Sequence, residues 1–459
     1  MARGSTEMGW LGMRRLLNIF CACMVLAPAL QGQVPVVPEQ EGWTLPRLIS
    51  YAATNAADAR IAFHRMRAAR SVMDQASSAL WPQLQLQGSY TRTDNPMTVF
   101  GGLLSQRAFS QSLDFNHVPD MDMLNLRGGV SYLLHSGGRT KAGRESAKAR
   151  SEAVQAQAEQ VRQSLAFEVV RTFYTVVKTR SFVEAAESAV KSFEGHLQVA
   201  NGRLQSGNIL RTEVLDMQVR LAQAREDLGR ARSAYSLAQH GLRNLIGIGP
   251  GALHLVEVGS EPQVVTLPGS EGDSDTSRRA EWRVVRALKR AAEEEVNRAK
   301  AGYQPRVSAF GQLDSDSGWR TDGNGNSYTA GLLVQWDVWD GRLTQARVAE
   351  ARALVDVAAE EEEKLRLAIE LELTEARLRL ENAKERLGVS EQAILHAEES
   401  VALSRLRFEQ GLLLALQLMD AQTALTAARV RQAEARADYR IALGAVRKAL
   451  GLSQVELNH

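Results

Sequence analysis

The fold is decided by a stretch of sequence that occurs twice: RLQSGNILRTEVLDMQ at residues 203–218 and RFEQGLLLALQLMDAQ at residues 407–422. Both copies have Arg, Gly, Asp and Gln at the same four positions. The alignment extends without a gap over residues 130–247 and 334–451, at a constant offset of 204. Self-similarity over such a span indicates a tandem duplication. We therefore expect one structural unit to be present twice.

The composition excludes several classes of protein. The chain has 459 residues, with 55 Lys and Arg against 53 Asp and Glu. A nucleic-acid-binding protein would have a basic excess, and a disordered chain would be less than 44% hydrophobic and more one-sided in charge. The mean hydropathy of -0.24 excludes a polytopic bundle of membrane helices. It allows a β-barrel, because barrel strands are apolar on one side only.

Proline is absent from residues 120–249 and 306–459. Because proline disrupts helix interiors, these two runs are where long helices are expected. A helix over residues 139–206 would be about 100 Å long at 1.5 Å per residue. Gly207 and Gly411 offer left-handed positions, where each long helix would reverse into a shorter antiparallel partner.

Each copy has the same order of predicted elements: a helix, two strands, a long helix and a shorter helix. Upstream of Pro82 the offset between the copies is 223, which places 19 additional residues in the first copy, between Pro82 and Val130. The predicted organisation begins with a signal peptide at 1–33 and a first repeat at 34–247, which has strands near 83–93 and 125–136 and helices near 139–206 and 208–247. A linker or equatorial segment follows at 248–280. The second repeat, at 281–451, has strands near 305–316 and 327–340 and helices near 342–410 and 412–451, and a C-terminal tail covers 452–459.

The predicted strands alternate between apolar and polar residues, as Leu84, Leu86 and Tyr90 do with their glutamine and serine neighbours. Strands of this length and pattern suit a tilted crossing of a bilayer. Aromatic residues near strand ends are candidates for the membrane–water boundary; they are Tyr132, Trp336 and Trp339. A soluble β-sandwich with its own apolar core is the alternative interpretation.

The membrane interpretation requires several copies of the chain. Four strands cannot close a barrel, and the backbone groups of a free edge cannot remain unpaired in lipid. Three copies would supply twelve strands, a number compatible with a water-filled pore.

The first 33 residues have the pattern of an export signal. Arg14 and Arg15 precede a short apolar stretch, and Ala27-Pro-Ala29 offers a small-residue cleavage site. Lipidation of Cys21 or Cys23 is the alternative, although neither follows a typical lipoprotein triplet.

The order of helix, proline, alternating strand, loop, strand, glycine and long helix is present twice, with Trp81-Pro and Gly137-Gly in the first copy and Gln304-Pro and Gly341-Arg in the second. This order resembles the outer membrane efflux protein family, the TolC-like outer membrane factors. The two repeated stretches are similar to the aromatic-x-x-Gly and Asp-Val-Leu-Asp-Ala motifs of that family, and the resemblance extends from about Trp43 to Gly451. It implies a mainly α tandem-repeat fold with a twelve-stranded membrane β-barrel in a homotrimer and a long periplasmic α-helical coiled-coil barrel. It further implies a channel in the outer membrane of a Gram-negative bacterium, in contact with outer-membrane lipid and extending into the periplasm. The channel would accept cargo from a periplasmic adaptor protein and an inner-membrane pump of the RND, ABC or a similar class.

The resemblance also implies roles for the two helical turns. The candidate helical-tip and adaptor-contact residues are Gly207, Asn208, Glu213, Asp216, Gly411, Leu412 and Leu413. In the family the second tip carries two acidic residues that ring the closed entrance; the matching positions here are Gln417 and Asp420, so one acidic ring is missing. Two questions remain open at this stage. Glu213 and Asp216 serve either the entrance or contacts between helices, and the apolar run 412–419 is either core or an adaptor-docking surface.

Sequence motifs for catalysis or cofactors are not found. The chain has no Gly-x-Ser-x-Gly elbow, no phosphate-binding loop and no His-x-x-x-His pair. The segment that begins at Asp322 resembles the start of a calcium loop, but Ser327 and Leu333 stand where such a loop requires Gly and Glu, so a hairpin turn is expected. We therefore expect no enzyme, no cofactor, no metal and no nucleic-acid partner. The alternative to a channel is an exported coiled-coil scaffold with a small β-domain.

Overall fold

The structure is a computed structural model that describes residues 42–111, 114, 116–249, 255 and 275–455. The predicted signal peptide, with Cys21 and Cys23, lies outside the described residues, as do most of the 248–280 linker and the end of the tail. Internal contacts divide the chain at Gly42, and the unit that begins at Trp43 is described here.

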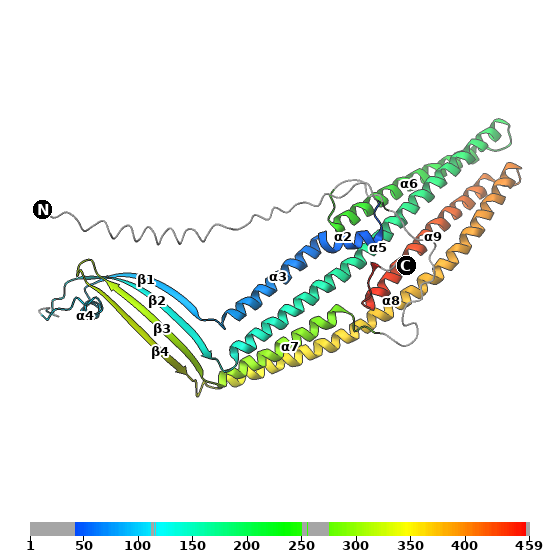
Figure 1. Cartoon of the computed structure of the whole chain (residues 1–459). Coiled ribbons are helices and arrows are strands. Elements are labelled where there is room, and N and C mark those ends of the chain that lie inside the picture. The colour runs from blue at the N-terminus through cyan, green and yellow to red at the C-terminus, as the bar shows by residue number, and fades with distance from the viewer. Residues whose placement is uncertain (1–41, 112–113, 115, 250–254, 256–274, 456–459) are drawn as a thin grey trace, which may run out of the picture. The chain divides into compact units, whose positions relative to one another are not determined.

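The two copies of the repeat share an order of helix, two strands, long helix and shorter helix, but in the described residues the first copy has two helices before its strands and a further helix between them (Figure 1). The first copy comprises α2 (Leu45–Asn55), α3 (Ala57–Ser78), β1 (Gln83–Thr93), α4 (Pro96–Ser105), β2 (Met121–His135), α5 (Arg139–Gln205) and α6 (Arg211–Ile246). The second comprises α7 (Ala280–Lys300), a short 3-10 helix (Ala301–Tyr303), β3 (Arg306–Ser317), β4 (Asn324–Gln335), α8 (Leu343–Glu409) and α9 (Ala415–Ala449).

The long helices α5 and α8 have 67 residues each, which corresponds to about 100 Å. Helix α5 packs against α3, α6, α7 and α9, while α8 packs against α7 and α9. Alanine is the commonest buried residue type of α5, and small side chains allow neighbouring helices to approach closely along their length. Within the described residues, no helix combines the length and the apolar character needed to cross a membrane.

The expected first helix of the first copy is two helices. The pattern of Leu48, Ala52, Ala59 and Ala62 predicts one continuous helix, but Ala56 has an extended backbone, with φ -61° and ψ 145°. The end of α6 lies against this break: a Cβ on Gly247 would be 3.0 Å from the carbonyl oxygen of Asn55. Local spacing cannot reveal a break that is set by packing against a helix some 190 residues away.

The four strands form one antiparallel sheet in the order β1-β2-β3-β4. The register places polar residues opposite one another across three strands, as Gln87 pairs with Arg127, and Arg127 pairs with Asp314. The neighbouring pairs are mainly apolar, as Leu84 lies opposite Val130. The sheet therefore has a polar face and an apolar face. Residues of the apolar face are exposed; they include Leu84, Leu86, Tyr90, Leu126, Val130, Leu313, Tyr328, Leu332 and Val334.

Two strand ends and one loop differ from the expected pattern. Strand β2 begins at Met121, and β4 ends at Gln335, so Trp336 and Trp339 follow the strand instead of lying within it. The first hairpin loop lies where the first copy has its 19 additional residues, and it contains helix α4. The Asn95 side chain caps this helix by accepting hydrogen bonds from the backbone N–H groups of Met97 and Thr98.

A partly buried ionic network, with Arg279 as its buried member, joins three helices of the second repeat. Arg279 contacts Glu281 at 2.8 Å and Glu372 of α8 at 2.7 Å, and Lys448 of α9 contacts Glu372 at 3.1 Å. Burial by itself raises the pKa of Glu372, but the hydrogen bond and charge of Arg279, together with Lys448, outweigh burial and hold this pKa below its usual value. The network ties the start of α7 to α8 and α9.

Candidate functional site at the helical tips

Two turns of the same geometry reverse the long helices. Gly207 and Gly411 have φ values of +74° and +78°, a left-handed conformation that strongly favours glycine. In the first turn the N–H of Asn208 donates to the Arg203 carbonyl at 2.9 Å, and in the second the N–H of Leu412 donates to the Arg407 carbonyl at 2.9 Å. Three residues separate each glycine from the next helix. The repeated sequence thus forms the same C-terminal helix cap twice.

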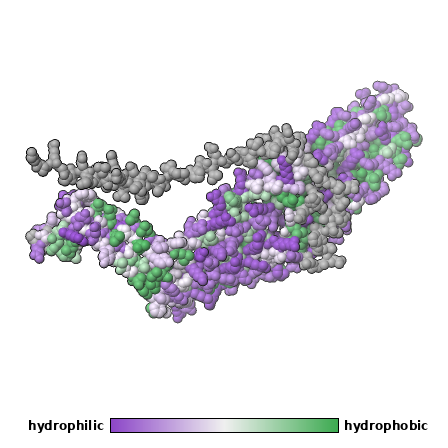
Figure 2. Space-filling view, in the orientation of Figure 1, coloured by the Kyte–Doolittle hydropathy of each residue, from purple (hydrophilic) through white to green (hydrophobic). Residues whose placement is uncertain are grey.

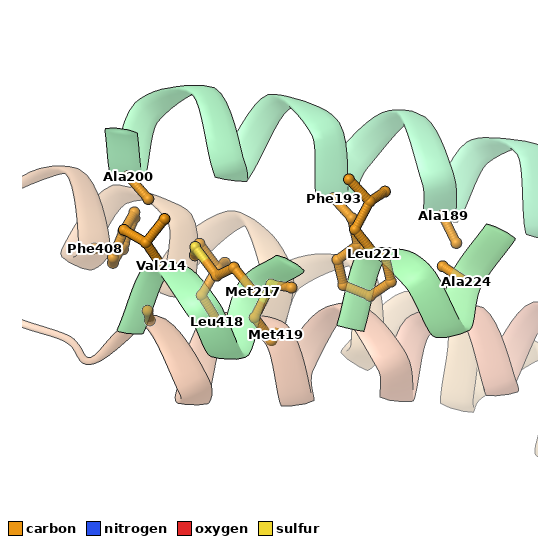
Figure 3. Packing of buried hydrophobic residues seen from close by; sticks show 11 residues of the cluster. Ala189, Phe193, Ala200, Val214, Met217, Leu221, Ala224, Phe408, Leu418 and Met419 are labelled. Atoms are coloured by element: carbon orange, nitrogen blue, oxygen red, sulfur yellow. The ribbon is translucent and has the colours of Figure 1, made fainter. Parts of the chain in front are cut away.

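The two tips are joined by one hydrophobic cluster, here named the tip core (Figure 3). It consists of Ala189, Phe193, Ala200, Val214, Met217, Leu221, Ala224, Phe408, Ala415, Leu418 and Met419. Side chains from α5 and α6 of the first repeat point toward side chains from α8 and α9 of the second (Figure 3). Phe408, Met217, Leu418 and Met419 are almost completely buried, so the tip core is a close contact between the repeats.

The apolar run at the second tip divides into two sets. Leu418 and Met419 belong to the tip core, and Leu413 is partly buried against it. Leu412 and Leu414, by contrast, are 73% and 61% exposed. Leu416 is also exposed, as is Leu210 at the first tip. The run therefore supplies both core and exposed apolar surface.

Arg203 connects the two turns. Its guanidinium donates a hydrogen bond to the carbonyl oxygen of Phe408 and lies 5.1 Å from the centroid of the Phe408 ring. Gly411 is favoured by its φ value of +78°, and a Cβ at this position would come within 2.9 Å of the Arg203 guanidinium and displace it. Such a cation–π and hydrogen-bond pair stabilises the contact between the tips.

Glu213 is a shared helix cap. Its carboxylate accepts a hydrogen bond from the N–H of Leu210, before α6, at 3.5 Å and another from the N–H of Ala415, the first residue of α9, at 3.3 Å. A carboxylate at a helix N-terminus satisfies free N–H groups and interacts favourably with the helix dipole. Asp216, one turn later, is exposed and has no ion-pair partner within the described part of the chain. The geometry thus places Glu213 between the helices.

Asp420 forms an ion pair with Arg220 of α6, with 3.2 Å between the carboxylate and guanidinium atoms. The two side chains are 58% and 36% exposed. Gln417 lies one turn earlier on α9 and is exposed as well. The pair links the two repeats and leaves part of the Asp420 carboxylate in contact with solvent.

His196 is a buried polar residue that the sequence did not single out. It lies on α5 beside Gln422 of α9. Burial lowers the pKa of His196, and the charge of Arg405 of α8 lowers it further. A single histidine in an alanine-rich helix carries no sequence signal of burial, because its environment is made by another repeat.

The apolar face of the sheet carries aromatic residues at two levels. Tyr132 lies near the end of β2, and the indole N–H of Trp336 donates to the Tyr303 carbonyl at 3.2 Å. Trp339 is exposed beyond β4. At the opposite end of the sheet, the rings of Tyr90 and Trp319 lie 5.5 Å apart.

The second aromatic level was not predicted, because its members come from strands and a turn that are distant in sequence. Tyr90 pairs with Leu124, which is eight residues before Tyr132 on β2. This spacing corresponds to about 26 Å along the strand at 3.3 Å per residue. At the tilt of about 40° of barrel strands, this separates the two levels by about 20 Å along the membrane normal, of the same order as the apolar band of a membrane barrel, which is about 25 Å tall. Figure 2 shows hydrophobic surface gathered over the sheet and again at the tips, while the long helices are largely hydrophilic between them.

Metal-binding geometry is not found in the part of the chain that the structure describes: it contains no group of three or more His, Cys, Asp or Glu residues able to hold an ion. The site is therefore a set of contacts between repeats and two exposed apolar surfaces.

Comparison with protein families identifies the architecture. A family model described as "Outer membrane efflux protein" matches residues 48–248 and 276–452, which is most of the chain. The chain belongs to the outer membrane efflux protein family. Members of this family are channel proteins of the outer membrane and not enzymes. A comparison with curated protein sequences finds no significant match.

Solved structures of outer-membrane channels share the fold of this efflux-family protein. The channel OprN matches with a TM-score of 0.75 and 22% identity, over 90% of each chain. VceC from Vibrio cholerae matches with a TM-score of 0.72 and 17% identity, over 89% of this chain and 96% of that one. CmeC from Campylobacter jejuni matches with a TM-score of 0.74 and 16% identity, over 89% of this chain and 85% of that one. The tandem-repeat, TolC-like fold is therefore the fold of this chain.

Proposed function

We propose that this protein is the outer-membrane exit duct of a tripartite efflux or type I secretion system. The observation that carries the proposal is the sheet, whose exposed apolar face ends in aromatic residues at two levels about 26 Å apart along the strand, beside the two long helices. Family membership supports the channel function itself. Cargo would leave an inner-membrane pump through a periplasmic adaptor and pass through this duct to the exterior.

The unpaired edges of the sheet support the proposal of a homotrimer. Strands β1 and β4 form the two edges within the described chain, and a free edge is not stable in lipid. Pairing β4 of one copy with β1 of the next, three times, closes a twelve-stranded barrel.

Helix α8 offers a second surface for the neighbouring copy. Exposed apolar residues recur along it at spacings of 3, 7, 11 and 14 residues, which places them on one side of the helix. The residues with these spacings are Leu343, Leu354, Val357, Leu371, Leu378, Val389, Leu403 and Leu406; Leu367 and Leu395 of α8 are also exposed but lie outside this series. A continuous apolar stripe on a long helix requires a partner along its whole length.

The polar face of the sheet would line the pore. Arg127 pairs with Asp314 at 2.7 Å, and Asn125 donates to Asp316 at 2.8 Å. These charges are matched within the wall, as expected where a barrel interior is hydrated.

The tips would close the periplasmic entrance and receive the adaptor. Exposed Leu412 and Leu414 at the second tip would supply an apolar surface for the adaptor, and exposed Gly207 and Asn208 at the first tip would supply hydrogen-bonding groups. The contacts of Arg203, Glu213 and Asp420 with the other repeat would hold the entrance closed, with Asp420 and Gln417 at its constriction.

Fractionation tests the function. The protein should remain with outer membranes after a carbonate wash, migrate as a trimer that dissociates on heating, and produce ion currents in planar bilayers. Release as a soluble monomer would overturn the proposal and favour the coiled-coil scaffold.

A further inference from the structure

Helix α4 lies on the polar face of the sheet, at the end away from the long helices. Its buried residues Val99 and Leu103 pack against Met121 of β2. Met121 is six residues from Arg127, so both side chains project from the same, polar face of the strand. A helix over this face occupies the side of the sheet that would become the pore.

Three close contacts fix α4 in this place. Gln106 is completely buried, and its amide donates to the Asp122 carbonyl at 2.9 Å. Its side-chain oxygen accepts a hydrogen bond from the Thr321 hydroxyl of the β3–β4 turn. On the edge strand β4, a Cβ at Gly325 would lie 1.9 Å from the carbonyl oxygen of Ser105, so only glycine fits there. The end of α4 is thus attached to β2 and to both sides of the β3–β4 hairpin.

The outer edge of α4 is apolar and exposed. Met97 is 79% exposed and Leu104 is 49% exposed, and both lie on one side of the helix with Gly101, whose Cβ position faces open space. The helix thus presents an apolar edge opposite the side that packs on the sheet.

We propose that the α4 edges of three copies meet on the axis of the trimer and close the outer mouth of the barrel. The partner of this surface is the same edge in the two other copies. This inference rests on the proposed twelve-stranded barrel. Apolar side chains at such a constriction would exclude water and ions until cargo separates them.

The dimensions of the barrel support this arrangement. Twelve strands spaced about 4.8 Å apart and tilted about 40° enclose a radius of about 12 Å. A helix packed on the inner wall has its axis about 10 Å from the sheet, since a helix with side chains is 10–12 Å wide. Its axis would therefore lie about 2 Å from the barrel axis. Three helices packed 8–10 Å apart need their axes about 5 Å from the barrel axis, which is farther out than this estimate. Three α4 helices at one level would therefore be in contact, and each would lie closer to the wall than the sheet–helix spacing alone gives.

Cross-linking of single-cysteine variants tests the contact. The natural cysteines are Cys21 and Cys23, so a cysteine introduced in the sheet domain has no other thiol after residue 23. Met97→Cys in the full-length protein in outer membranes should give covalent dimers and trimers with a short bismaleimide. Trp319→Cys is the matched control: it is 73% exposed at the same end of the sheet, but it contacts Tyr90 on the apolar face.

The outcomes separate this inference from the proposed function. Heat-sensitive trimers in which Met97→Cys is cross-linked no more than Trp319→Cys would overturn the convergence of α4 and leave the channel intact. Absence of trimers would overturn the proposed function itself. As a second readout, Met97→Asp combined with Leu104→Asp should separate the edges by charge repulsion. Labelling of Ser131→Cys, on the polar face, by a bulky maleimide added from outside should then rise several-fold; an unchanged rate would also overturn the inference.

Discussion

Glu213 provides a sharp test of the tip contacts, because one carboxylate accepts hydrogen bonds at the starts of two helices from different repeats. Replacement by alanine removes both bonds. A side-chain cap contributes about 0.5–2 kcal/mol, and a negative charge at a helix N-terminus adds about 0.3–1 kcal/mol. The distances of 3.5 and 3.3 Å are long for charged hydrogen bonds, so we expect a total loss of about 1–2 kcal/mol. Such a loss changes a local equilibrium by a factor of about 5–30.

Hydrogen exchange of the membrane-embedded trimer measures this loss. In Glu213→Ala the amide of Ala415 and those of the next turn of α9 should exchange about 5–30 times faster, whereas Glu213→Gln should have a smaller effect because it keeps an acceptor oxygen. Asp216→Ala is the matched control, since Asp216 is an exposed acid one turn away without an ion-pair partner in the described chain. Equal effects of Glu213→Ala and Asp216→Ala, or unchanged exchange at Ala415, would refute the shared cap.

Three further predictions follow from other contacts. Asp420→Asn and Arg220→Gln should each increase the open probability of the channel in planar bilayers, by similar and non-additive amounts. The free energy of opening should change by no more than about 1 kcal/mol, because the pair is exposed. A change in divalent-ion block with Asp420→Asn alone would instead show that Asp420 acts independently. Leu418→Ala should destabilise the tips by about 2–5 kcal/mol because Leu418 is fully buried. This loss should be measurable as faster proteolysis near residues 206–214 and 410–415. Unchanged cleavage would contradict the stabilising role of the tip core. The pKa of Glu372 is lowered in the folded state, so its stabilising contribution is present above the usual carboxyl pKa and is lost as the pH falls through the lowered value. The melting temperature of the protein should therefore fall in that acidic range. Arg279→Gln should reduce this pH dependence.

The sequence by itself determined the features that depend on local pattern. The two copies, the long helices without proline, the alternating strands and the glycine turns at Gly207 and Gly411 all follow from spacing and residue type. These features are set by backbone conformation and by the period of apolar residues, both of which are encoded within a few residues.

Only the tertiary structure decided what joins residues that are distant in sequence. It divided the apolar run of the second tip into buried Leu418 and exposed Leu412, and it placed Glu213 between α6 and α9. It also brought Asp420 to Arg220, 200 residues away, and folded α4 over the polar face of the sheet. The same helical spacing of apolar residues is compatible with many ways of packing two helical hairpins. Which side chains contact each other is therefore decided only when the hairpins pack together.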